Sequence, residues 1–232
     1  MWYHCRIGAG EGLSIKMIPD SIVEERKLSP AQDERRKALV AAARESFFTD
    51  GYAGTAMSTI AARVGGSKTT LWAYFPSKQD LFAAVVDDVV ETYGTALSIK
   101  LSQDEPLESE LLRFAQAMMT TILSPPVLTL HRLVAGEAGR FPELGKMFFE
   151  RGPKRGKAML ADFMAGAMKA QRLRTGDPMV AARQFVAMCQ SGCFQRALHG
   201  CMDHIEPPMI EADIEAALDS FRRAWENPNA NM

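Results

Sequence analysis

Residues 65–79 read GGSKTTLWAYFPSKQ, and this stretch decides the fold of the chain. Because glycine adopts positive φ without a Cβ clash, the glycine pair can end one helix and form a tight turn. Ser67 can then cap a short helix with its hydroxyl, and Pro76 stops that helix roughly two turns later. Ser77 caps the helix that follows. The stretch therefore predicts a turn, one short helix and the start of another.

The short helix has an unusual outward face. Leu71 and Phe75 are one helical turn apart and are predicted to face inward together. The remaining positions carry a lysine, hydroxyls and aromatic rings: Lys68, Thr69, Thr70, Trp72 and Tyr74. Such groups can contact phosphates, base edges and thymine methyls in the major groove of double-stranded DNA. The alternative is an ordinary surface helix in which Trp72 is partly packed.

A second helix is predicted just before the turn, over residues 55–64. Its apolar side chains share one helical face: Met57, Ile60, Ala61 and Val64. A helix, a short glycine turn and a second helix make a helix-turn-helix, and in that motif the second helix enters the major groove.

Three residues beside this motif are further candidates for DNA contact. Thr55 and Ser58, around the start of the first helix, can donate to phosphate, although capping of that helix is the alternative. Lys78 lies in the first turn of the helix after the motif, where its charge and the helix amides can bind one phosphate together. An uncommitted surface lysine is the alternative there.

The composition is that of an ordinary globular protein, with 232 residues, 47% of them hydrophobic and 24% charged. The formal net charge is −1, yet residues 33–82 carry seven basic and five acidic side chains. Such a small positive excess predicts DNA affinity that depends on a few well-placed contacts and on dimerisation. No apolar run approaches the ~18 residues of a membrane helix, and no signal-peptide pattern appears. We therefore expect a cytoplasmic protein with no membrane partner.

Apolar periodicity predicts an all-α protein of about nine helices. Residues 1–32 show no sustained period and are expected to form a flexible arm. Residues 33–82 are predicted to form the helix-turn-helix DNA-binding domain, whose last helix continues to about residue 101. Residues 83–232 are predicted to form a regulatory domain for ligand binding and dimerisation.

Residues 35–86 resemble the DNA-binding domain of the TetR family of transcriptional regulators. The matching residues are Leu39, Ala42, Ala43, Phe47, Gly51, Tyr52, Thr55, Ile60, Ala61, Gly65, Ser67, Lys68, Thr70, Leu71, Tyr74, Phe75, Ser77, Lys78, Leu81 and Phe82. Two residues depart from the pattern: Gly66 replaces a small aliphatic residue, and Trp72 replaces the usual tyrosine. Residues 132–153 also resemble the C-terminal domain of an AefR-like or AcrR-like subgroup.

The resemblance implies a homodimer whose two short helices bind a pseudo-palindromic operator. It places the dimer interface in the last two helices, predicted over residues 179–198 and 210–225. It also implies that a small molecule bound among the C-terminal helices releases a repressor from DNA, with activation left open as the alternative.

Methionine content points to an apolar effector, because eleven of the fourteen methionines follow residue 106 and methionine suits adaptable pockets. The predicted ligand-binding residues face the expected domain centre: Met118, Ile122, Phe148, Met164, Met168, Phe185 and Cys189. Ordinary core packing is the alternative for each. His131, Arg132 and Glu137 are possible polar anchors, with exposed or capping roles as the alternative.

Two other functions stay open. Cys189 and Cys193 are four residues apart and could form a thiol redox switch that controls DNA binding, or could be two small buried hydrophobes. An all-α enzyme is the second alternative, although no nucleophile–base pair, phosphate loop or familiar zinc spacing stands out. We expect no catalytic residues, no bound metal and no cofactor.

Overall fold

The computed structural model describes residues 29–202 and 204–228, so most of the predicted arm lies outside the described residues. The described part is all-helical, apart from one isolated bridge between Leu173 and Glu226. Its helices are α1 (Pro30–Gly54), α2 (Met57–Arg63), α3 (Lys68–Tyr74), α4 (Lys78–Tyr93), the 3-10 helix η1 (Thr95–Leu97), α5 (Leu107–Leu123), α6 (Pro125–Glu137), α7 (Pro142–Arg151), α8 (Pro153–Lys169), α9 (Pro178–Cys189), α10 (Cys193–Leu198) and α11 (Pro207–Trp225). The all-α prediction is confirmed. None of these helices is both long enough and apolar enough to cross a bilayer.

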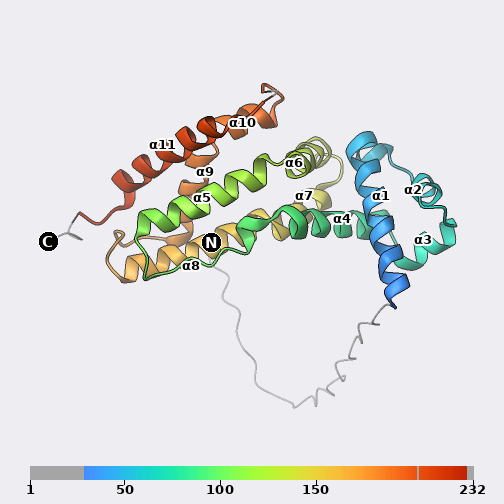
Figure 1. The fold of residues 1–232 in the computed structure, drawn as a ribbon, viewed down its shortest axis with the longest axis horizontal. Coiled ribbons are helices and arrows are strands. Elements are labelled where there is room, and N and C mark those ends of the chain that lie inside the picture. Colours follow the sequence, from blue (N-terminus) through green and yellow to red (C-terminus); the bar gives the residue numbers. More distant parts are fainter. Residues whose placement is uncertain (1–28, 203, 229–232) are drawn as a thin grey trace, which may run out of the picture.

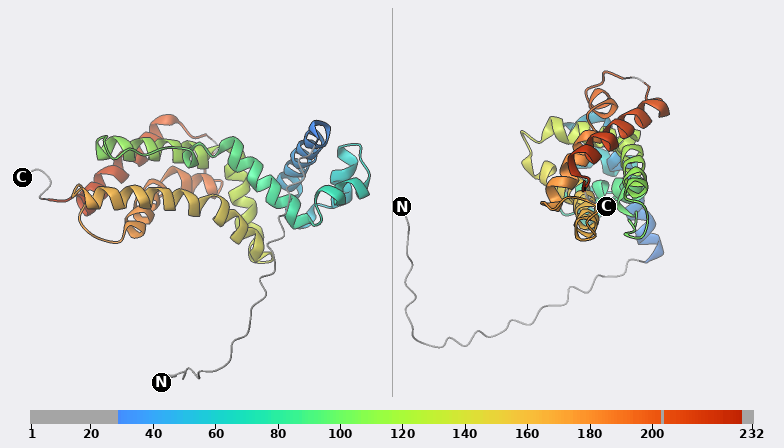
Figure 2. Two further views of the ribbon diagram at one scale, coloured as in Figure 1. Left: turned by 90° about the horizontal axis from the view of Figure 1, so that it is seen from below. Right: turned by 90° about the vertical axis from the view of Figure 1, so that its left-hand side faces the viewer.

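The molecule is elongated, with the helix-turn-helix at one end (Figures 1 and 2). Helix α4 runs from this end into the remaining helices, and α9 and α11 lie toward the other end. Helix α1 begins earlier than expected, because Ser29 and Gln32 form a capping box around Pro30. Residues 30–32, predicted to belong to the arm, are therefore helical.

Two predicted helices are interrupted where glycine lets a polar group approach closely. The helix expected to continue to about residue 101 ends at Tyr93, and its C-cap is Gly94, where a Cβ would collide with the Val90 carbonyl. The helix expected over residues 179–198 breaks before α10, where Asp213 of α11 accepts the backbone N–H of Cys193 at 2.6 Å. This break accounts for one of the helices beyond the predicted nine.

Buried apolar side chains form two clusters. The N-terminal cluster contains the core of α1–α4 together with five residues of α6 and α7: Val127, Leu130, Val134, Leu144 and Phe148. The C-terminal cluster is built mainly from α5, α8, α9, α10 and α11. Helices α6 and α7 therefore pack as much with the helix-turn-helix end as with the rest of the chain.

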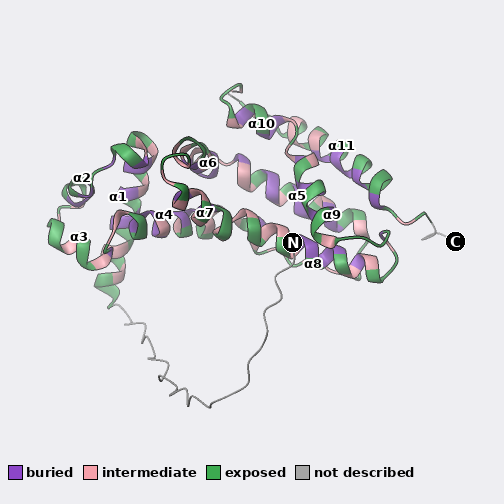
Figure 3. Ribbon diagram, turned by 180° about the vertical axis from the view of Figure 1, so that it is seen from behind, coloured by how far each residue is buried: buried purple, intermediate pink, exposed green. Residues whose placement is uncertain are grey.

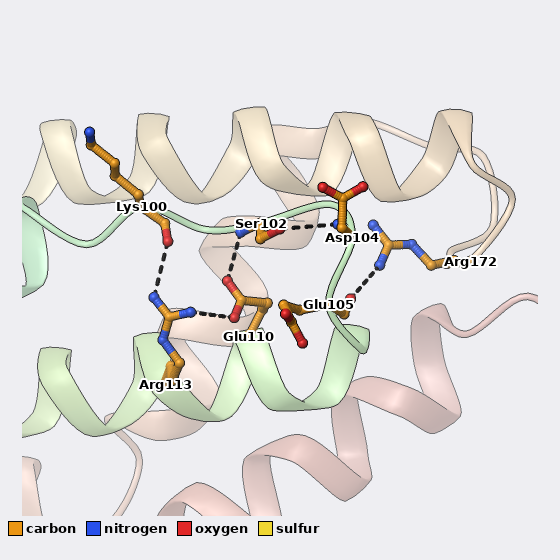
Figure 4. A network of polar contacts seen from close by, with 7 residues as sticks. All are labelled: Lys100, Ser102, Asp104, Glu105, Glu110, Arg113 and Arg172. Atoms are coloured by element: carbon orange, nitrogen blue, oxygen red, sulfur yellow. Dashed lines mark hydrogen bonds and ion pairs between the residues drawn. The ribbon is translucent and has the colours of Figure 1, made fainter.

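A buried carboxylate holds the segment between α4 and α5 (Figure 4). Glu110 is 1% exposed and accepts the backbone N–H of Ser102 at 2.7 Å and an N–H of Arg113. Arg113 also donates to the Lys100 carbonyl at 3.0 Å, and Arg172 of the loop after α8 donates to the Glu105 carbonyl. These contacts fix the connection that leads from the helix-turn-helix end into α5.

Candidate DNA-binding surface and ligand cavity

Helix α3 has the geometry that the sequence predicts. Ser67 accepts the N–H of Thr70 at 3.1 Å, and Gly65 adopts a φ of 65° in the turn before it. Leu71 and Phe75 are buried at 0% and 3% exposure. The short helix is therefore anchored on its inward face by two apolar side chains.

Helix α3 lies at the end of the molecule that α1, α2 and α3 form (Figure 3). Lys68, Thr69 and Trp72 are exposed, and the Trp72 indole keeps 38% of its surface accessible. Thr70 and Tyr74 are half-buried, and the Thr70 hydroxyl lies 2.9 Å from the Ser67 hydroxyl. All five predicted contact residues thus lie on one short helix, and three of them are exposed.

The two candidates around the start of α2, Ser58 and Thr55, differ in exposure. Ser58 is exposed on α2, as a phosphate contact requires. Thr55 is 4% exposed, and its hydroxyl lies 2.7 Å from the Gly51 carbonyl and 3.1 Å from that of Ser46. The N-cap of α2 is Ala56. The prediction that Thr55 contacts phosphate or caps α2 is therefore wrong, because its hydrogen-bond donor serves the kink in α1.

Lys78 is half-buried against an aromatic ring. Its Nζ lies 4.5 Å from the centroid of the Tyr52 ring, a cation–π distance. Burial lowers the pKa of Lys78, and the nearby Glu137 carboxylate partly offsets that effect. Lys78 therefore packs the start of α4 against Tyr52 near the end of α1. It is not the uncommitted surface lysine that the alternative described.

Two arginines of α1 flank the motif and were not singled out from the sequence. A Cβ on Gly66 would collide with the Arg35 guanidinium, so this cation occupies the space that a side chain at the turn would fill. The Arg36 guanidinium lies 5.3 Å from the centroid of the Phe75 ring. The run of basic residues at 35–37 is the feature of the sequence that indicates additional phosphate contacts beside the motif.

A cavity of about 300 Å³ lies at the seam between the two clusters. Its walls come from α4, the segment around η1 and α5–α9, and they are formed by Val89, Val90, Gly94, Ala96, Leu97, Phe114, Met118, Thr121, Ile122, Val127, Leu130, His131, Phe148, Phe149, Gly152, Pro153, Gly156, Lys157, Val186 and Gln190. The cavity therefore contacts both the helix-turn-helix end and the C-terminal helices.

Three of the seven predicted ligand-binding residues line this cavity: Met118, Ile122 and Phe148. The other four do not line it. Met164, Phe185 and Cys189 are 0% exposed inside the C-terminal cluster, and Met168 packs against that cluster. Helical periodicity finds the inward-facing residues, but it does not indicate where the interior is left unfilled.

Of the three possible polar anchors, His131 is the one that lines the cavity. Its ring packs edge-to-face against Phe148 and Phe194, with centroids 4.6 Å and 5.5 Å away. Burial lowers the pKa of His131 to about 4, so the imidazole is neutral near pH 7. The other two polar candidates lie elsewhere: Arg132 donates to the Leu198 carbonyl at 3.1 Å, and Glu137 accepts the Ala53 N–H at 2.9 Å.

The burial of His131 predicts a pH-dependent stability. The pKa falls from 6.5 in the unfolded chain to about 4, so the unfolded state binds more protons between these values. The contribution of His131 to the free energy of unfolding is therefore fully present above about pH 7. It is lost as the pH falls, by roughly 2 kcal/mol between pH 7 and pH 5. Urea unfolding at both pH values should show this loss for the wild type and for His199→Phe, an exposed control. His131→Phe should lack it, and an equal loss in that variant would contradict the assignment.

The two cysteines proposed as a redox pair are both buried, at 0% for Cys189 and 3% for Cys193. Burial raises the pKa of each thiol to about 12, and Asp213 adds to the shift for Cys193. Since the thiolate is the reactive form, both thiols are poor candidates for oxidation. Across residues 29–202 and 204–228, no group of three or more histidine, cysteine or acidic side chains is arranged to hold a metal ion.

Comparison with known proteins decides the family. A model described as "AefR-like transcriptional repressor, C-terminal domain" matches residues 109–227, just over half of the chain. A second model, "Bacterial regulatory proteins, tetR family", matches residues 39–85. The chain belongs to the TetR family. It is a transcriptional regulator with a DNA-binding helix-turn-helix, as the resemblance in the sequence predicted.

Individual relatives agree with this assignment. The solved structure of the "Flavonoid-responsive Regulator FrrA" is 32% identical, covers 85% of this chain and 99% of its own, and superposes with a TM-score of 0.74. The "HTH-type transcriptional regulator RutR" of Escherichia coli K12 is 39% identical over 81 residues, which are 35% of this chain and 38% of RutR. The "HTH-type transcriptional activator FasR" of Mycolicibacterium smegmatis is 37% identical over 87 residues, 36% of this chain and 40% of FasR. The chain thus spans about two-fifths of the length of these curated relatives. TetR-family members are generally not enzymes.

Proposed function

We propose that this TetR-family regulator is a homodimeric repressor that a small, largely apolar effector releases from its operator. The observation that carries the proposal is the position of the cavity. Val89 and Val90 of α4 line it, and the same helix begins at Lys78, directly after the recognition helix α3. An effector that binds better when α4 is displaced would favour a state whose recognition helices no longer match the operator.

Helix α6 supplies a second connection between cavity and DNA-binding end. Leu130 and His131 line the cavity, and Glu137 at the end of the same helix accepts the Ala53 N–H. Gly51, in the α1 kink beside it, has a φ of 74°, which favours glycine. The Tyr52 ring packs against Phe141 after α6, with centroids 5.0 Å apart. A shift of α6 would therefore reach the helix-turn-helix directly.

The test is fluorescence anisotropy with DNA from just upstream of the protein's own gene and with scrambled DNA. Sequence-dependent binding that a small apolar compound reverses would support a releasable repressor. Because FrrA is described as flavonoid-responsive, flavonoids belong in the first effector panel. Binding strengthened by the effector would instead favour an activator, as the name of FasR allows. No sequence preference on any genomic fragment would overturn the proposal.

The proposed dimer interface comprises the outward faces of α9–α10 and α11. The outward face of α11 presents small side chains four residues apart, at Ala212, Ala216 and Ser220. Met179 and Val180 at the start of α9 are large apolar residues that remain 37% and 36% exposed. Small residues permit close helix approach, and exposed apolar ones favour burial against a partner.

Ala216→Glu is expected to dissociate the dimer. The substitution would place like charges in the proposed interface, and burying an unpaired carboxylate costs several kcal/mol, so the dimer constant should weaken by about 100-fold or more. Sedimentation equilibrium measures the effect, and circular dichroism checks that the helices persist. The matched control is Ala165→Glu on the exposed side of α8, which should remain dimeric. A dimeric Ala216→Glu would place the interface elsewhere.

A further inference from the structure

The walls of the cavity define the shape of its ligand. At about 300 Å³ it lies at the lower end of ligand pockets, which run from roughly 300 to 1,000 Å³. Phe114, Phe148 and Phe149 contribute aromatic rings to a lining that is otherwise mostly aliphatic. Aromatic rings pack best against other flat rings in stacked or edge-to-face arrangements. The walls therefore favour a compact molecule with aromatic rings.

The lining has a basic side chain and no acidic one, which disfavours cationic ligands. No aspartate or glutamate is among the lining residues, so a buried cation would have no counter-charge there. Lys157 is the charged side chain of the lining, and its Nζ lies 5.5 Å from the ring centroid of Phe149, which is 47% exposed. A weakly acidic group is therefore tolerated at the side of the cavity formed by α7 and α8, and a positive group is not.

His131 adds a specific requirement to these general ones. Within the described residues neither ring nitrogen forms a hydrogen bond, although the ring lies between two phenyl groups. A neutral imidazole has one N–H donor and one acceptor nitrogen. A hydroxyl can satisfy either nitrogen because it both donates and accepts, whereas an alkyl group would leave the imidazole unpaired in an apolar site.

Gln190 is a second uncharged polar residue of the lining without a described hydrogen bond. It follows α9 directly, one turn after Val186 of the lining and four residues before Phe194, which contacts the His131 ring. Its side-chain amide forms no hydrogen bond with any described residue. The hydroxyl of Thr121, by contrast, already lies 3.3 Å from that of Thr95. The uncharged polar side chains of the lining that form no hydrogen bond with a described residue are thus His131 of α6 and Gln190 after α9.

We infer that the cavity selects a neutral or weakly acidic hydroxylated aromatic molecule, and that the His131 imidazole recognises its hydroxyl. The inference rests on the proposed function in taking this cavity as the effector site. A hydroxyl that approaches His131 would contact α6 six residues before Glu137, whose carboxylate accepts the Ala53 N–H near the end of α1.

The test uses three biphenyls that differ in one group: 4-hydroxybiphenyl, 4-methylbiphenyl and 4-biphenylmethylammonium. Isothermal titration calorimetry with the full chain should show the hydroxyl compound binding about tenfold more tightly than the methyl compound, and the ammonium compound binding most weakly. In His131→Phe the hydroxyl preference should fall below about twofold while the methyl compound still binds, which shows that the cavity is intact. His131→Gln, which keeps hydrogen-bonding capacity, should retain part of the preference.

His199→Phe is the matched control, because His199 is exposed and its Nδ1 lies 2.7 Å from the Gln195 carbonyl. It should keep the wild-type preference. Equal binding of the hydroxyl and methyl compounds, a preference retained in His131→Phe, strongest binding of the ammonium compound, or no binding of any compound would each overturn the inference. DNA release is measured separately by anisotropy. His131-dependent binding without release would contradict the proposed repressor mechanism and leave the ligand assignment standing.

Discussion

Replacing both Lys68 and Trp72 with alanine is expected to weaken operator binding by at least about 100-fold. Each residue is exposed on α3, and a groove contact of this kind contributes about 1–3 kcal/mol of discrimination. In the proposed dimer both subunits carry the two substitutions, so the loss of binding free energy is doubled. Because Leu71 and Phe75 anchor α3 and are unchanged, the variant should fold normally. Anisotropy at two salt concentrations, with circular dichroism as a folding check, measures the effect.

Two single variants separate base recognition from charge. Trp72→Ala should lower affinity for the operator much more than for scrambled DNA, because its indole can read base edges. Arg35→Gln should lower affinity for both DNAs alike and reduce the salt dependence, because we expect the guanidinium beside the Gly66 turn to contact phosphate and not bases. Lys169→Gln, an exposed substitution at the end of α8, should change neither. Wild-type affinity of the double variant would show that α3 does not contact DNA.

Replacing Glu110 with alanine is expected to lower the free energy of unfolding by about 3 kcal/mol. The carboxylate is 1% exposed, and its removal takes away the acceptor of the Ser102 N–H and the ion-pair partner of Arg113. Truncation also leaves a small void in the core. Urea unfolding followed by circular dichroism measures the change at pH 7.

The neighbouring Glu108 is the matched control. It is exposed and pairs with Arg222 across 3.2 Å, so Glu108→Ala should cost no more than about 0.5 kcal/mol. Glu110→Gln keeps one acceptor oxygen and should lie between the two. If Glu110→Ala unfolded with the same midpoint as Glu108→Ala, the network of Figure 4 would not stabilise the fold.

The helix-turn-helix was predictable because its signals are local. Ser67 and Ser77 cap helices through bonds to residues three positions away, and the Gly65 turn depends on its own φ. The periodicity that put Leu71 and Phe75 inward acts over a single helical turn. The role of Thr55 was not predictable in the same way, because its hydroxyl turns back to the kink in α1 that contains Gly51.

The residues of the ligand site could be predicted only in part, because they depend on packing between helices. Met118, Ile122 and Phe148 were found because they face inward, but Met164, Phe185 and Cys189 face inward equally and fill the C-terminal cluster instead. Periodicity does not distinguish a packed interior from an unfilled one. That difference depends on how side chains from several helices meet.

The sequence alone determined that the described part of this protein is all-helical, that one short helix has a polar and aromatic outward face, and which residues lie on that helix. These properties follow from capping, turn geometry and periodicity, which act within a few residues along the chain. Tertiary structure alone decided where the cavity lies, that His131 enters it and that Glu137 reaches Ala53. Such features arise from contacts between segments tens of residues apart, and only the packed helices bring those segments together.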